Sequence, residues 1–167
     1  MRRRTLLLAG AALGLSGCGF RLRGRVQLPE ALAVVRITEP DRPGSQPSAL
    51  IPVLGRLLEA NGVEISDDPA RASGRIVLLR ESRQRRILGT DAADDTRQYQ
   101  LRYLVTYRVE AGAGGILQGP VEIAVERELV LPESDVLGGQ QNERLVLREL
   151  HNEAAYTILR RLRTLNP

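Results

Sequence analysis

The sequence predicts an α/β fold, a two-layer sandwich in which two helices pack on one face of a four-stranded mixed sheet in the order β-α-β-β-β-α. Two kinds of apolar periodicity support this prediction. Residues 96–111 alternate apolar and polar side chains, which is the repeat of a half-buried strand. Residues 48–61 and 142–165 repeat apolar side chains every three or four positions, as amphipathic helices do. Because two such helices need one apolar sheet face to bury their stripes, two layers follow.

The first two elements of the predicted domain are a strand and a helix. Residues 31–38, "ALAVVRIT", are a β-branched apolar run closed by a proline-rich loop, so we expect a strand there. In the segment 48–61, Ser48 can cap a helix, Pro52 is tolerated in its first turn, and Gly62 supplies a left-handed stop. The leucines that follow the helical period are Leu50, Leu54, Leu57 and Leu58. This helix should cross over right-handedly between two parallel strands.

Three longer strands are expected at residues 75–87, 96–111 and 121–131. The stretches "DAADD" and "GAGG" mark the turns between them, which predicts an antiparallel meander. Three tyrosines share the apolar face of the middle strand, and that phase favours core aromatics over a binding surface: Tyr99, Tyr103 and Tyr107.

The closing element is the helix at residues 142–165, which Gly138 and Gly139 precede. Its apolar stripe comprises Leu147, Leu150, Ala154, Ile158, Leu162 and Leu165. We expect it to lie beside the first helix on the same sheet face. The sole histidine, His151, is in this helix without a metal-ligand or acid–base partner at a useful spacing, so we expect it at the solvent.

The N-terminus has the pattern of an exported protein. Residues 1–17 combine three arginines with an apolar run of signal-peptide length, and the stretch "LSGC" resembles the lipobox of bacterial lipoproteins. Cys18, the only cysteine, is then the lipidation site, which leaves no thiol for a disulfide or a metal. The alternative is a small buried cysteine near an ordinary cleavage site. On the lipoprotein interpretation, residues 18–30 are a lipidated tether and residues 31–167 a single domain.

Composition narrows the possible partners. The chain of 167 residues is long enough for one domain, and no segment is apolar enough to span a bilayer. Removing residues 1–17 with their three arginines lowers the formal net charge from +4 to +1. A nearly neutral exported domain is a poor candidate for binding nucleic acid, so none is expected as a partner.

Several stretches together resemble the LptE family of lipopolysaccharide-assembly lipoproteins. They are "CGFRLRG" after the lipobox, "LEANGVEI" at the first helix end, the strands "RQYQLRYLVTYRV" and "VERELVL", and "NERLVLRELHNEAAYTILRRL". The resemblance implies a non-enzymatic outer-membrane lipoprotein on the periplasmic side, without a cofactor. It further implies that the domain plugs and helps assemble an LptD-type β-barrel, in a one-to-one complex, and binds lipopolysaccharide on its way to the cell surface.

The hairpin between the first two long strands is the candidate binding surface. Arg83, Arg85 and Arg86 are in an arginine-rich segment that also holds Arg80 and a single acid, Glu81. Planar guanidinium groups suit the phosphates of lipid A or acidic groups inside a barrel. The alternative is that these arginines only pair with acids of the adjoining turn, which are Asp91, Asp94 and Asp95.

Arg127 is a second candidate. It is in phase with the apolar residues of its strand, where a bare charge is costly, so its stem should pack on apolar neighbours while its guanidinium reaches an acid or the rim. Ligand contact is the other possibility. The sequence shows no nucleophile elbow, phosphate loop or zinc pair, so an enzyme is not expected. A lipid-anchored periplasmic module for another envelope partner stays as the alternative function.

Overall fold

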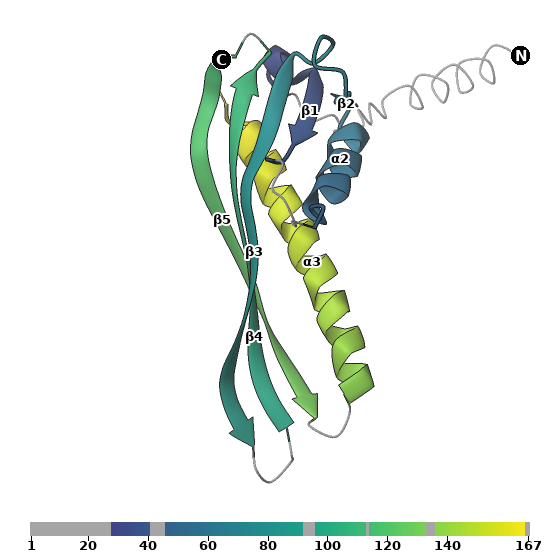
Figure 1. Cartoon of the computed structure of the whole chain (residues 1–167), viewed down its shortest axis with the longest axis vertical. Coiled ribbons are helices and arrows are strands. Elements are labelled where there is room, and N and C mark those ends of the chain that lie inside the picture. The colour runs from purple at the N-terminus through teal and green to yellow at the C-terminus, as the bar shows by residue number, and fades with distance from the viewer. Residues whose placement is uncertain (1–27, 41–45, 92–95, 113, 133–135, 166–167) are drawn as a thin grey trace, which may run out of the picture.

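The structure is a computed structural model that describes residues 28–40, 46–91, 96–112, 114–132 and 136–165. The predicted signal peptide and the lipidation site Cys18 lie outside the described residues. The mixed α/β fold is confirmed (Figure 1). The sheet has five strands in the order β2-β1-β3-β4-β5, one more than predicted. The extra strand, β2 (Glu64–Ile65), has only two residues, too few for alternation to reveal it.

The meander of three long strands is confirmed. β3 (Gly74–Asp91), β4 (Thr96–Ala111) and β5 (Ile116–Pro132) pair antiparallel in chain order. β1 (Val34–Thr38), after a 3₁₀-helical turn at Glu30–Leu32, runs parallel to both β2 and β3. β5 begins before the predicted residue 121, because an edge strand tolerates a proline within it.

The first helix, α2 (Leu50–Ala60), has the predicted signals at both ends. The Ser48 hydroxyl oxygen accepts hydrogen bonds from the backbone N–H groups of Leu50 and Ile51, at 3.1 and 3.4 Å. Gly62 has a φ of 87°, a conformation that favours glycine, and the chain turns there into β2. Local sequence therefore determines where this helix begins and ends.

The last helix, α3 (Val136–Leu162), begins earlier than the predicted residue 142. The prediction that Gly138 and Gly139 precede the helix is wrong, because both lie within it. Gly139 is buried, and a Cβ there would lie 3.5 Å from the Leu131 side chain. The first turns of α3 thus lie against β5.

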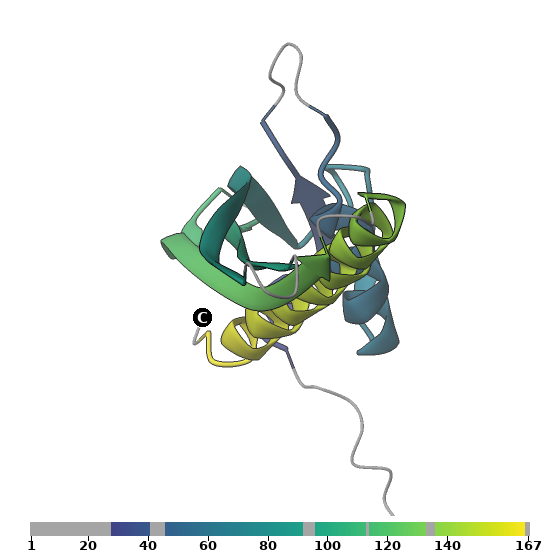
Figure 2. The same ribbon diagram turned by 90° about the horizontal axis from the view of Figure 1, so that it is seen from below.

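Both helices lie on one side of the curled sheet, and they contact each other (Figure 2). The core between them and the sheet includes Val35, Leu54, Leu58, Ile76, Tyr103, Tyr107, Leu150, Ile158 and Leu162. Tyr103 and Tyr107 are fully buried, so their role as core aromatics is confirmed.

The long strands extend beyond the rest of the molecule. β1 pairs with β3 only from Gly74 to Val77, and the lower part of Figure 1 contains only the long strands and the start of α3. We call this part, residues 80–91, 96–106 and 122–132, the distal ribbon. Within the described chain, no strand pairs with the free edge of β3 there. The rest of the sheet, with β1, β2 and α2, is the proximal half.

Candidate functional site: an arginine-rich ribbon

A β-bulge decides which way the arginines of β3 point. Before it, Ile76 and Leu78 are buried on the helix side of the sheet. The register shifts between Leu78 and Arg80, so the phase of alternation reverses. After the bulge, Arg83 pairs with Tyr103 and therefore shares its face toward α3. Arg80 and Arg86 lie on the opposite face, which no helix covers.

Two arginines on the helix side of the distal ribbon, Arg85 and Arg127, find partners on α3. The Arg85 guanidinium lies 3.3 Å from the Glu143 carboxylate and stacks over the Tyr99 ring at 5.1 Å from its centroid. The Arg127 guanidinium lies 2.7 Å from the Glu153 carboxylate. The expectation that Arg127 reaches an acid is therefore confirmed.

The alternative that these arginines pair with acids of the adjoining turn stays a prediction. Asp94 and Asp95 lie outside the described residues, and so does the side chain of Asp91. The sequence interpretation did not find Glu143 and Glu153. A signal was available, because each is within one helical turn of the apolar stripe on α3, where it can face the sheet.

Three arginines of β3 are exposed and make no ion pair within the described residues. They are Arg80, Arg83 and Arg86. All three are on the part of β3 that has a free edge. Their guanidinium groups are therefore available to an external anion, whereas Arg85 and Arg127 would first have to release a carboxylate.

Arg83 also lines a cleft of about 450 Å³ between the bulge of β3, the start of α2 and α3. Its other described lining residues include Glu39, Ser48, Arg80, Glu81, Ser82 and His151. The cleft therefore carries charges of both signs beside a histidine.

His151 is buried, with 8% of its surface exposed, so the expectation of a solvent-exposed histidine is wrong. It belongs to the stripe of α3, one turn after Leu147, and its ring packs edge-on against Tyr103 with centroids 4.7 Å apart. Burial lowers the pKa of His151, with Arg83 acting in the same direction and Glu81 opposing it. Burial raises the pKa of Tyr103, and Glu81 raises it further. Both groups are neutral at pH 7.

The end of the distal ribbon exposes apolar side chains. Ile87 is 54% exposed, Leu88 42% and Val130 58%. These residues follow directly on the arginines of β3 or lie across the sheet from its end. The surface is thus cationic along one edge and apolar at its tip, which suits a ligand with phosphates next to acyl chains.

Other kinds of site find no support in the part of the chain that the structure describes. No cluster of histidine, cysteine and acidic side chains there could hold a metal ion. No described helix is long and apolar enough to cross a membrane.

The chain is similar to known lipopolysaccharide-assembly proteins. The family model LptE, described as lipopolysaccharide-assembly, matches residues 35–162. The LPS-assembly lipoprotein LptE of Photorhabdus laumondii subsp. laumondii is 27% identical over 168 residues, covering 99% of this chain and 89% of that protein. The LptE of Pectobacterium atrosepticum is 29% identical over 171 residues, with the same coverage.

Solved structures of lipoproteins share the fold. Lipoprotein B from Nitrosomonas europaea matches with a TM-score of 0.66 at 24% identity, over 85% of this chain and 88% of that one. A minor lipoprotein from Acinetobacter baumannii matches with a TM-score of 0.63 at 22% identity, over 79% and 91%. The rare lipoprotein B from Shewanella oneidensis matches with a TM-score of 0.61 at 21% identity, over 77% and 92%.

Proposed function

The chain belongs to the LptE family of lipopolysaccharide-assembly lipoproteins, and from that membership we propose that it binds lipopolysaccharide and plugs an LptD-type β-barrel in the outer membrane. The family is one of transport lipoproteins and not of enzymes. The chain acts by recognition, as a one-to-one partner of the barrel on the periplasmic side.

One observation carries the lipopolysaccharide part of the proposal. Arg80, Arg83 and Arg86 are exposed cations without an ion pair in the described chain, and they lie along the strand that leads to the apolar tip, where Arg86 directly precedes Ile87. Lipid A carries phosphates next to acyl chains, so it can meet guanidinium groups and apolar side chains in one contact. Arg85 and Arg127 also lie on the ribbon, where each pairs with a glutamate of α3.

The shape of the molecule supports the plugging part. The distal ribbon and α3 form one slim, elongated body (Figure 1). Its uncovered face alternates charges, for example with Arg102 of β4 opposite Glu126 of β5 at 4.0 Å. A charged exterior suits the water-filled interior of a barrel.

Binding to purified lipopolysaccharide tests the ligand. Replacing Arg80, Arg83 and Arg86 together with glutamine should weaken binding by about a hundredfold at low salt, since each guanidinium makes charge-assisted bonds to phosphate. The matched control replaces Arg56, Arg144 and Arg148, three exposed arginines of the helices. If both triple variants lose the same affinity for lipopolysaccharide, the loss comes from net charge alone and the site is refuted.

Purification of the native lipoprotein from outer membranes tests the partner. We expect a large β-barrel protein in equal amount. Recovery of the lipoprotein alone would favour the alternative of a free-standing periplasmic module for another envelope partner. Mass spectrometry of the same material tests the anchor, since acyl chains on Cys18 are required for the membrane attachment that we propose.

A further inference from the structure

A second cationic pocket lies at the opposite end of the sheet from the distal ribbon. It has a volume of about 150 Å³ and is lined by Arg36, Pro69, Ala72, Gly74, Arg75, Ala111, Gly112 and Gly114. Arg36 and Arg75 are paired in register on the neighbouring strands β1 and β3, so their side chains stand next to each other on the uncovered face. A small cavity flanked by two guanidinium groups is suited to an oxyanion.

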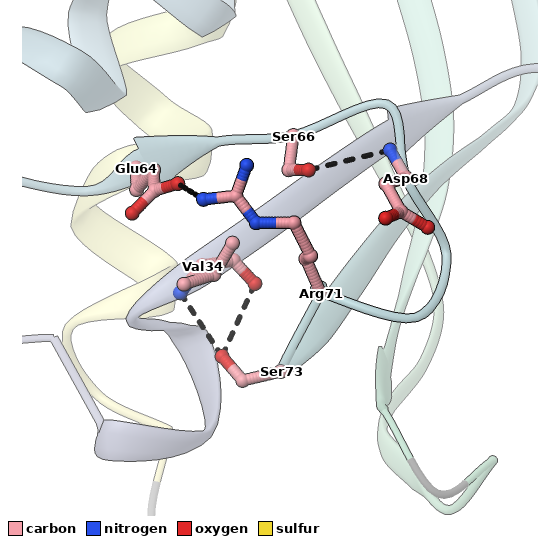
Figure 3. Close-up of polar contacts among 6 residues, drawn as sticks. All are labelled: Val34, Glu64, Ser66, Asp68, Arg71 and Ser73. Atoms are coloured by element: carbon pink, nitrogen blue, oxygen red, sulfur yellow. Dashed lines mark hydrogen bonds and ion pairs between the residues drawn. The ribbon is translucent and has the colours of Figure 1, made fainter.

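Hydrogen bonds between Ser73 and β1 fix the loop at the wall of this pocket (Figure 3). The Ser73 hydroxyl accepts a bond from the Val34 N–H at 3.0 Å and donates one to the Val34 carbonyl oxygen at 3.1 Å. Arg71 does not line the pocket, and its guanidinium is paired with Glu64 at 2.5 Å. A Cβ on Gly112 would lie 2.7 Å from the Ala72 carbonyl oxygen, so only glycine allows this close approach.

The charge around the pocket is unbalanced. The buried Glu110 carboxylate binds both Arg75 and Arg108, the latter at 2.5 Å. Arg36 has no ion pair or side-chain hydrogen bond within the described chain. Glu110 thus serves Arg75 and Arg108, while Arg36, which is in register with Arg75, has no acid of its own. Like charges on neighbouring strands destabilise a sheet, and a bound anion would relieve this repulsion.

The pocket lies where the described chain begins. The Ala31 carbonyl oxygen packs against Gly74, within 2.5 Å of where a Cβ would stand. Leu28, the first described residue, follows Cys18 by ten residues, and ten residues reach about 35 Å at most. If Cys18 carries acyl chains, this end of the domain is held close to the surface of the leaflet that contains them.

We propose that this pocket binds the phosphate of a phospholipid headgroup in that leaflet, with the guanidinium of Arg36 as the main donor. Arg75 holds Glu110 through Nε and Nη2, so it can contribute only its Nη1 group as a second donor. The inference uses the proposed anchor at Cys18, and it adds a second membrane contact that fixes the orientation of the domain. A planar guanidinium can give two parallel hydrogen bonds to one phosphate, which an ammonium cannot.

Titration of the full-length acylated protein in a nonionic detergent tests the pocket. The probe is short-chain phosphatidylglycerol, and the readout is the NMR signals of the Arg36 and Arg75 Nε–H groups. We expect both signals to shift with one saturating midpoint. Arg36→Gln should raise that midpoint about tenfold, the loss of one charge-assisted contact, and Arg36→Lys should raise it less. Arg56→Gln, the same loss of charge on an exposed residue of α2, should leave it unchanged.

Competition with inorganic phosphate distinguishes a phospholipid headgroup from free phosphate as the bound anion. Inorganic phosphate should displace the lipid only at much higher concentration. Equal affinity for inorganic phosphate and lipid would overturn the headgroup assignment. A midpoint unchanged in Arg36→Gln, with native circular dichroism, would overturn the pocket. The titration needs neither a bilayer nor lipopolysaccharide, so a negative result would leave the proposed function standing. The triple variant of the distal ribbon should still bind the short-chain phosphatidylglycerol.

Discussion

The two ends of the same three strands differ in what surrounds them. In the proximal half, β1 pairs with β3, both helices cover the sheet, and the carboxylate of Glu110 accepts two arginines. In the distal ribbon, β3 has a free edge, Arg80, Arg83 and Arg86 have no ion pair in the described chain, and apolar side chains face solvent. The three strands stay paired through both ends, so the bulge in β3 and the neighbouring elements make the difference.

The comparison teaches where stability and recognition lie. Buried apolar area and the paired carboxylate of Glu110 stabilise the proximal half. The distal ribbon leaves cations and apolar surface unsatisfied, and a protein keeps such a surface for a ligand or a partner. Mutations in the two regions should therefore affect different measurements.

The largest expected difference is in the free energy of unfolding. Leu54→Ala, in the fully buried α2 core, should lower it by about 3 kcal/mol, through lost burial and a residual cavity. Ile87→Ala, at the exposed tip, should lower it by less than about 0.5 kcal/mol. Urea unfolding followed by circular dichroism measures both.

Lipopolysaccharide binding should show the reverse order. Ile87→Ala should weaken it, whereas Leu54→Ala, at a temperature where it is folded, should not. Equal destabilisation by the two substitutions would mean that the tip is packed against the domain and would abolish the distinction between the two regions.

A second expected difference is the effect of Glu110→Gln in the proximal half. Hydrogen bonds from Arg75 keep the pKa of Glu110 below its usual 4.5, against the opposing effect of burial. The carboxylate therefore stabilises the fold above pH 4.5, and this contribution is lost as the pH falls through the lowered pKa. Glu110→Gln should cost about 1 kcal/mol at pH 7 and less at pH 3. A constant cost across this range in urea unfolding would contradict the pairing.

The boundary between the two regions should respond to pH in a different window. His151 is buried with a lowered pKa, while Glu81 and Arg83 face it from β3. Since the unfolded chain takes up the proton first, stability should fall as the pH drops below 6.5, by at most about 1.4 kcal/mol per unit. His151→Phe should remove this slope, and Glu110→Gln should leave it in place. If the slope of unfolding free energy against pH is unchanged in His151→Phe, another titrating group causes it.

The elements with strong local signals could be predicted from the sequence. The alternation in β4 and the Ser48 and Gly62 ends of α2 are set by neighbouring residues, and the structure has them as predicted. The start of α3 could not be predicted, because Gly138 and Gly139 usually interrupt a helix. Here the packing of Gly139 against Leu131 outweighs that tendency.

The candidate site was predicted only in part, for a similar reason. Arg83, Arg85 and Arg86 stood out as a run, but their separation into paired and unpaired side chains depends on the bulge after Leu78 and on α3. Both are tertiary features that a charge pattern does not encode. The sequence interpretation places His151 at the solvent because no acid or metal partner is near it in the sequence. Its helical spacing from Leu147, however, indicates a buried position.

The smallest expected effect concerns the ion pairs that hold the distal ribbon to α3. Arg127 and Glu153 are each about half exposed, with side-chain exposures of 49% and 40%, so solvent screens their attraction. A double-mutant cycle with Arg127→Gln and Glu153→Gln should give a coupling of about 0.5 kcal/mol or less at physiological salt. A coupling above about 2 kcal/mol would show that Arg127 is a structural part of the ribbon. Because a weak pair costs little to open, Arg127 would remain able to exchange Glu153 for a phosphate, and Arg127→Gln should then weaken lipopolysaccharide binding without lowering stability.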